Sequence, residues 1–103
     1  MYNNVNTQDA NGNTALMRAA IMAPGVSLGL VMALVNDGAD INIQNNYGNT
    51  AIILAAMVNN HDTVSFLLDC GANVLLRNED GLSVREVMNA NSSEYMKVLN
   101  MLS

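Results

Sequence analysis

The chain has 103 residues, of which 50% are hydrophobic and 13% are charged, so it has room for one domain with a modest core and is too apolar to be intrinsically disordered. Nine acidic and four basic residues give a net charge of −5, which argues against binding to nucleic acid or to anionic lipid. One cysteine and one histidine exclude an internal disulfide and a histidine-rich metal site.

The amino-terminal third contains the longest apolar stretch of the chain, residues 15–35. Arg18 interrupts it and Pro24 lies in its middle, so its uncharged part, residues 21–35, is shorter than the roughly 20 residues that a membrane-spanning helix needs. Residues 1–13 are polar and lack the basic and apolar segments of a secretory signal. We therefore expect no membrane segment and a cytoplasmic or otherwise intracellular location.

Two stretches of the sequence repeat each other, and a third, weaker copy follows at Val74. The first begins at Val5 and reads VNTQDANGNTALMRAA; the second begins at Ile41 and reads INIQNNYGNTAIILAA. Gly48 and Gly81 lie 33 residues apart, and a period near 33 predicts a solenoid of stacked units. We divide this single domain, residues 1–103, into units at about 5–40, 41–73 and 74–103.

Each unit contains the signals of a tight turn followed by two short helices. Gly12 and Gly48 mark the turns, because glycine adopts a positive φ at little cost. Thr14 and Thr50 follow where a helix N-cap is expected, and Gly38 stands where a second helix ends. We expect first helices near residues 14–21, 50–57 and 83–89, and second helices near residues 27–36, 62–69 and 93–101.

The first unit is three residues longer than the second, and the extra residues fall at Ala23, Pro24 and Gly25. Pro24 has no backbone N–H and disfavours a helical conformation at Ala23. We expect the extra residues to bulge as a longer loop between the two helices, without lengthening either helix.

The repeated motif resembles the ankyrin repeat, whose units read Gly-x-Thr-Pro-Leu-His-x-Ala-Ala and end in Gly-Ala-Asp. Residues 12–20 read GNTALMRAA, residues 48–56 read GNTAIILAA and residues 38–40 read GAD. The resemblance covers nearly the whole chain from Val5 onward. It implies an all-α, ankyrin-type helical-hairpin solenoid with short β-turn or hairpin loops. About three repeats are implied, the third a degenerate carboxy-terminal cap that carries Lys97 and Asn100.

The chain departs from the family at one informative position. Met17, Ile53 and Glu86 stand where the family has histidine. The resemblance implies that this histidine ties adjacent loops together by hydrogen bonds. We therefore expect that network to be missing here, apolar packing to take its place, and the loops to be looser.

Candidates for catalysis or metal binding are few. His61 and Cys70 lie nine residues apart on one expected helix, which places them on roughly opposite faces. Glu79 and Asp80, with Glu86 nearby, are interpreted as a solvated turn rather than as paired catalytic carboxylates. We expect no enzyme activity, no metal, no cofactor and no small-molecule substrate.

The resemblance also implies that a partner protein meets the turn tips and the inner helices. Tyr47 places an aromatic side chain at the middle tip, and methionines along the inner helices suit an adaptable apolar stripe. The alternative is that the stripe packs against neighbouring repeats and that Tyr47 covers its own hairpin. The predicted partner-binding residues are Asn11, Asn13, Met17, Asn46, Tyr47, Asn49, Ile53, Met57, Glu79 and Asp80.

These observations favour a non-catalytic protein–protein interaction module whose partner protein is unidentified. The module stands alone or forms part of a longer ankyrin repeat protein. Its net charge of −5 favours a neutral or basic partner segment. The less favoured alternative is a self-assembling structural unit, a homo-oligomer in which an apolar concave or end face pairs with another copy.

Overall fold

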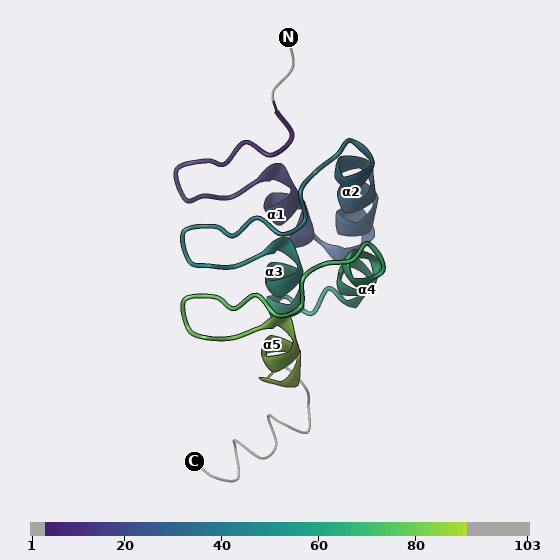
Figure 1. Cartoon of the computed structure of the whole chain (residues 1–103). Helices are drawn as coiled ribbons and strands as arrows, with labels where there is room; N and C mark the ends of the chain where they lie inside the picture. Colours follow the sequence, from purple (N-terminus) through teal and green to yellow (C-terminus); the bar gives the residue numbers. More distant parts are fainter. Residues whose placement is uncertain (1–3, 91–103) are drawn as a thin grey trace, which may run out of the picture.

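The computed structural model describes residues 4–90, within which the chain forms five α-helices and no strand. The first helix of each unit joins an inner column and the second helix an outer column, while three hairpin loops project to one side (Figure 1). This arrangement confirms the predicted all-α helical-hairpin solenoid. The inner column consists of α1 (Ala15–Ala20), α3 (Ala51–Met57) and α5 (Val84–Ala90), and the outer column of α2 (Pro24–Asn36) and α4 (His61–Asp69).

The predicted inner helices are confirmed at all three positions, whereas the outer helix expected at 93–101, with Lys97 and Asn100, lies outside the described residues. Threonine caps explain the first two starts. Thr14 Oγ1 accepts a hydrogen bond from the Met17 N–H (3.2 Å), and Thr50 Oγ1 accepts one at the same position of α3. These caps satisfy N–H groups that have no acceptor within the helix.

The outer helix α2 begins three residues earlier than the sequence predicts. Pro24 is its first residue, where a missing N–H breaks no helical bond, and Ala23 before it has extended backbone (φ −52°, ψ 139°). The prediction of a bulged loop is therefore wrong, because Pro24 and Gly25 lengthen α2 to 13 residues, against 9 in α4. No helix within the described part of the chain combines the length and apolarity that crossing a bilayer requires.

Apolar contacts between neighbouring units form one continuous core. In the inner column, the alanine pairs at residues 19–20 and 55–56 are buried, and their small side chains let the helices approach closely. In the outer column, Val31 of α2 and Leu67 of α4 are both 0% exposed. Each unit therefore buries its apolar side chains against a neighbour, as expected of a solenoid.

Two buried polar contacts join the first unit to the second. The hydroxyl oxygens of Ser27 in α2 and Thr63 in α4 lie 3.0 Å apart, and both residues are 0% exposed. Asn60, which precedes α4, donates from Nδ2 to the carbonyl of Ala20 (3.1 Å). Directional bonds in apolar surroundings restrict how α4 sits on the first unit, since a shift would leave these groups unpaired.

Candidate partner-binding site

The three hairpin loops have the same local hydrogen bonds and lie next to one another along the stack (Figure 1). Asp9, Asn45 and Asn78 hold the same position in successive loops. Oδ1 of each accepts from the backbone N–H groups two and four residues further on, at 2.9–3.0 Å. Such side-chain-to-backbone bonds define an Asx-type turn, so all three loops take the same shape.

Side-chain amides join each loop to the next. Asn45 Nδ2 donates to Asn13 Oδ1, and one unit later Asn78 Nδ2 donates to Asn49 Oδ1, both over 2.9 Å. Because the donor and acceptor recur at the same places in successive loops, one bond is repeated along the stack. These bonds are partly buried, which makes them costly to lose.

The backbone of the loops follows the same period. Asn46 donates its N–H to the carbonyl of Asn11 (3.0 Å), and Glu79 donates its N–H to the carbonyl of Tyr47 (2.8 Å). The loops come so close at Gly48 (φ 77°) that an added Cβ would lie 2.9 Å from the Asn78 Cα. We call the two side-chain bonds and these two backbone bonds between loops the amide ladder.

Two glutamines reinforce the base of the loops. Gln8 Nε2 donates to the Gly12 carbonyl of its own loop (2.8 Å) and to the Gln44 carbonyl of the next (3.2 Å). Gln44 repeats the pattern, donating to Gly48 (2.9 Å) and to Arg77 (3.0 Å). Each glutamine thus closes one hairpin and binds the following one.

The expectation of loose loops without a tying network is therefore wrong. Asn and Gln amides join the loops, although Met17 and Ile53 replace the histidine that the resemblance assigned to this task. The sequence held a signal for this, because Gln8 and Gln44 recur at one repeat position, followed in each case by an Asp or Asn.

The structure brings the predicted tip residues together but does not give them equal exposure. Tyr47 is 56% exposed, so it does not cover its own hairpin. Asn13 and Asn49 are only half-exposed, and the amide ladder uses their Oδ1 atoms. The tip residues with exposed side chains are Asn11, Asn46, Tyr47, Glu79 and Asp80.

Two residues predicted to line an exposed apolar stripe are buried instead. Met17 is 2% exposed and Ile53 is 1% exposed, because each inner helix is covered by its neighbours and by an outer helix. The prediction that they contact a partner is wrong, and the alternative of core packing describes them. Met17 has a further structural role, since its Sδ accepts a hydrogen bond from the Thr14 N–H (3.4 Å) and completes a capping box.

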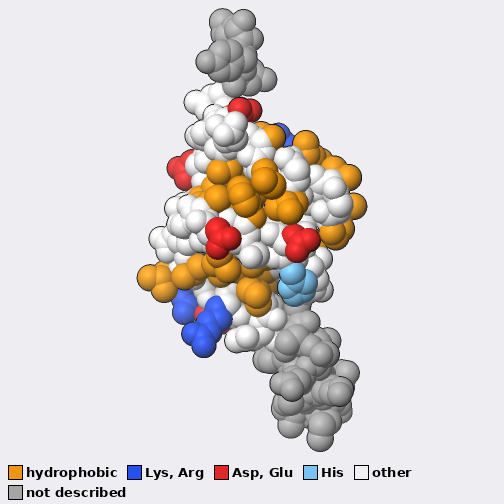
Figure 2. All heavy atoms as spheres, turned by 90° about the vertical axis from the view of Figure 1, so that its right-hand side faces the viewer, with side chains coloured by type: hydrophobic (Ala, Val, Ile, Leu, Met, Phe, Trp, Pro, Cys, Tyr) orange, Lys and Arg blue, Asp and Glu red, His pale blue; other side chains and the backbone are white. Residues whose placement is uncertain are grey.

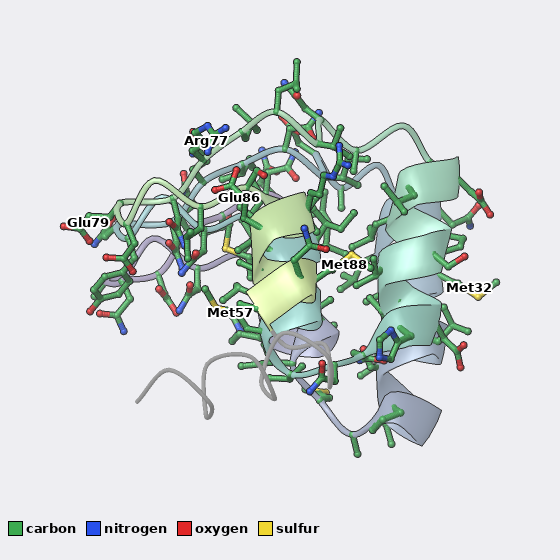
Figure 3. All side chains as sticks on the ribbon, turned by 90° about the horizontal axis from the view of Figure 1, so that it is seen from below. Met32, Met57, Arg77, Glu79, Glu86 and Met88 are labelled. Atoms are coloured by element: carbon green, nitrogen blue, oxygen red, sulfur yellow. The ribbon has the colours of Figure 1, made fainter. Side chains whose placement is uncertain are left out.

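In the inner column, apolar side chains reach the surface at the carboxyl ends of α1 and α3, and Met88 of α5 is exposed as well. Met57 is 39% exposed, and Figure 3 shows it on the side of the inner column away from α2 and α4. The neighbouring exposed residues are Ile21, Met22 and Val58. We call the exposed tip residues together with Met57 and these three apolar residues the concave face.

The first loop carries a carboxylate with a lowered pKa. Hydrogen bonds from the Asn13 and Asn11 N–H groups, together with the Arg18 guanidinium 3.1 Å away, hold the pKa of Asp9 below its ordinary value. A carboxyl group with a lowered pKa is ionised at neutral pH. Asp9 is therefore suited to accept structural hydrogen bonds rather than to donate a proton as a general acid.

The third unit carries a similar carboxylate. The Ser83 hydroxyl donates to Glu86 Oε1 (3.0 Å), and this bond, with the Arg77 guanidinium at 2.6 Å, lowers the pKa of Glu86. Glu86 therefore belongs to an N-terminal helix cap and to an ion pair. Glu79 and Asp80 take part in neither ion pair of the described residues, so they present negative charge at the third tip.

The candidates for metal binding and catalysis stand apart from one another within residues 4–90. No three His, Cys, Asp or Glu side chains of this part lie close enough together to hold a metal ion. His61 is the first residue of α4, and Cys70 is the exposed cap residue at its other end.

Comparison with known proteins gives consistent matches. A family profile described as ankyrin repeats (3 copies) matches residues 2–79. The rat (Rattus norvegicus) protein named Ankyrin repeat and SAM domain-containing protein 6 is 37% identical over 87 residues, which are 84% of this chain and 10% of that protein. The mouse (Mus musculus) protein of the same name is 36% identical over 87 residues, with the same coverage. The chain spans about a tenth of the length of these curated relatives.

Proposed function

This chain belongs to the ankyrin repeat family, and on that premise we propose that it binds a partner protein through its concave face. Ankyrin repeats are generally protein–protein interaction modules and are generally non-catalytic. We propose one repeat domain over residues 1–103, with units at about 5–40, 41–73 and 74–103.

The observation that carries this proposal is the amide ladder beneath exposed tips. The ladder fixes the backbone at Asn46 and Tyr47, so the exposed side chains of these residues stand in place before a partner arrives. Pre-ordered contact residues lose little entropy on binding. A half-exposed aromatic side chain on such a support has the properties of an interface anchor.

The chemistry of this face defines the kind of partner. Met57 and the exposed apolar residues at the carboxyl ends of α1 and α3 offer a hydrophobic contact on the inner column. Glu79 and Asp80 at the third tip, and the net charge of −5, favour a partner segment that is neutral or basic. We therefore propose a protein segment that combines an apolar side chain with lysine or arginine. Opposite charge mainly raises the rate of encounter, and the apolar contact contributes most to affinity.

The test compares two double variants of the full chain. A protein captured from lysate of the source cells is purified, and its affinity is measured by calorimetry for wild type, for Tyr47→Ala with Met57→Ala, and for the control Met32→Ala with Ser65→Ala. Met32 is 48% exposed on α2 and points away from the inner column (Figure 3), so the control removes exposed side chains from the outer helices.

We expect the Tyr47 and Met57 variant to lose at least about tenfold in affinity, since hot-spot anchors contribute about 2 kcal/mol or more and about 1.4 kcal/mol corresponds to tenfold. The control should bind as wild type does. An affinity lost only in the control would move the site to the outer helices and contradict the proposal.

A further inference from the structure

At the amino-terminal end of residues 4–90, α2 presents an apolar stripe, followed by Asp37, that no described residue covers. Val26, Leu30, Ala33 and Asp37 follow one another at spacings of four, three and four residues, which places them on one face of the helix. Val26 is 54% exposed, Leu30 is 41% exposed, and Ala33 and Asp37 are exposed as well. We call these four residues the end stripe. In Figure 2, which views the molecule from the side of α2 and α4, hydrophobic side chains gather toward the upper, amino-terminal part.

The next unit shows what this face does elsewhere in the stack. The residues 33 positions after Leu30 and Ala33 are Thr63 and Phe66. In α4 that face is turned to α2: Thr63 is 0% exposed and bonded to Ser27, and Phe66 packs against the core. The end stripe is therefore the continuation of the interface between outer helices, without a neighbour among the described residues.

The composition of α2 also fits contact with another helix. None of its 13 residues is charged. Gly29 lies beside the end stripe, and a Cβ added there would meet nothing within 4 Å in this chain. Glycine inside a helix lowers its stability relative to alanine. No neighbour within residues 4–90 comes close enough to require a glycine at this position, whereas a second helix could approach closely there.

An open hollow of about 1110 Å³ lies next to the end stripe. Val5, Ala15 and Leu34 contribute apolar surface to it, and Arg18 and Asp37 contribute opposite charges. The end face thus has a ridge, the end stripe, and a recess beside it.

We propose that this end face binds the same face of a second copy of the chain, with the two α2 helices antiparallel. The opposite end of the described stack does not match it, because Arg85 and Glu86 replace the buried Ile52 and Ile53 of the preceding unit. Head-to-tail contact would set these charges against α1 of the next copy, because α5 and α1 both belong to the inner column. A two-fold contact sets apolar surface against apolar surface and closes after two copies.

The antiparallel arrangement also pairs the ends of the two helices. The N-cap residue of α2, Ala23, provides no side-chain hydrogen bond, and the first turn holds no acidic residue. Asp37 follows the last residue of the helix. In the dimer each Asp37 carboxylate lies near the uncapped amino end of the other α2, where negative charge is stabilised.

The test is the mass of the full chain in solution, measured by sedimentation equilibrium from about 10 µM to about 1 mM. Reductant is present throughout, because the exposed thiol of Cys70 would otherwise form intermolecular disulfides. Leu30→Asp is compared with Met32→Asp, which changes a similarly exposed residue of the same helix that points away from the end stripe. Val26→Asp is a second variant of the end stripe, and circular dichroism checks that every variant is folded.

We expect the mass of wild type and of Met32→Asp to rise with concentration from 11.0 kDa toward twice that value. Leu30→Asp and Val26→Asp should weaken self-association at least about tenfold. A wild type that stays at 11.0 kDa over the whole range, a mass that passes beyond the dimer, or a dimer that Leu30→Asp leaves intact would each overturn the proposal. This inference does not depend on the concave face, since Leu30→Asp leaves Tyr47 and Met57 unchanged.

Discussion

Neighbouring helices of this stack meet through alanine, valine and leucine side chains, whereas neighbouring hairpin loops meet through asparagine and glutamine amides. The helical layer contains the fully buried residues Val31 and Leu67. The loop layer contains the amide ladder and the bonds of Gln8 and Gln44. The same 33-residue period is thus maintained by two kinds of force in two layers of one small domain.

This difference between the two layers indicates which repeat positions accept different residue types. Apolar burial has no preferred direction, so Met17 and Ile53 fill the same place in successive units. Hydrogen bonds are directional, so the loop layer repeats the same residue types, with Asn at both 45 and 78. Burial of apolar side chains contributes most of the stability, and the hydrogen bonds of the amides fix the positions of the exposed tips.

The largest effect is expected from Leu67 in the helical layer. It is 0% exposed, so Leu67→Ala should lower the free energy of unfolding by about 2–5 kcal/mol, out of a total of about 5–15 kcal/mol for a domain of this kind. Chemical denaturation measures the loss, with Leu68→Ala, at a residue 44% exposed, as the control. A loss below about 1 kcal/mol for Leu67→Ala would show that the outer column is not a core.

The contact between loops is tested by two glycines with the same backbone conformation. Gly48 and Gly81 have φ of 77° and 80°, so alanine at either site carries the left-handed cost of about 1–2 kcal/mol. Only at Gly48 does the added Cβ also meet the next loop, 2.9 Å from Asn78 Cα and Glu79 N. Gly48→Ala should therefore destabilise by at least about 1 kcal/mol more than Gly81→Ala. Equal losses in thermal unfolding would mean that the second and third loops do not touch.

The amide ladder itself is tested by Asn45→Ala. This change removes the donor to Asn13 Oδ1 and the acceptor for the Tyr47 and Asn49 N–H groups. We expect a loss of about 1–3 kcal/mol, because partly buried partners are left without bonds. Asn46→Ala, at an exposed side chain with one bond to the Ala10 carbonyl, should cost less. A larger loss for Asn46→Ala than for Asn45→Ala would show that the side chains at the tips, rather than the amide ladder, stabilise the loops.

The smallest effect is expected when the stability of the chain is measured at acidic pH. The pKa values of Asp9 and Glu86 are lower in the folded chain than their ordinary values. Both groups therefore contribute stability above the ordinary pKa range of carboxyl groups, and that stability is lost as the pH falls through the lowered values. Denaturation midpoints should decline modestly on acidification, and Glu86→Gln should flatten the decline. A midpoint that rises on acidification would contradict the assignment.

Much of the fold could be predicted from the sequence. Thr14 and Thr50 after turn glycines, followed by apolar runs, place the inner helices to within a residue or two. Pro24 misled the prediction because proline both interrupts helices and starts them. Only the packing of α2 on its neighbours decides between the two roles.

The site was less predictable, for physical reasons. A helix of six or seven residues in the middle of a stack is covered on several sides, so its sequence does not reveal that Met17 and Ile53 are buried while Met57 is exposed. The tying role of Asn45 and Asn78 depends on the distance between loops, which no single loop specifies. The tip positions of Asn46 and Tyr47 followed directly from the repeat, whereas the exposure of Tyr47 did not, since the sequence also allowed Tyr47 to cover its own hairpin.

Backbone amide exchange by NMR tests the central claim most directly, because the amide ladder assigns bonds to particular N–H groups. The N–H groups of Asn46 and Glu79 donate to the preceding loop, whereas that of Ala10, at the corresponding place in the first loop, has no hydrogen-bond acceptor within residues 4–90. We predict that exchange at Asn46 and Glu79 is at least about tenfold slower than at Ala10. Exchange at Asn46 and Glu79 as fast as at Ala10 would show that the loops are not joined and that the concave face is not preformed.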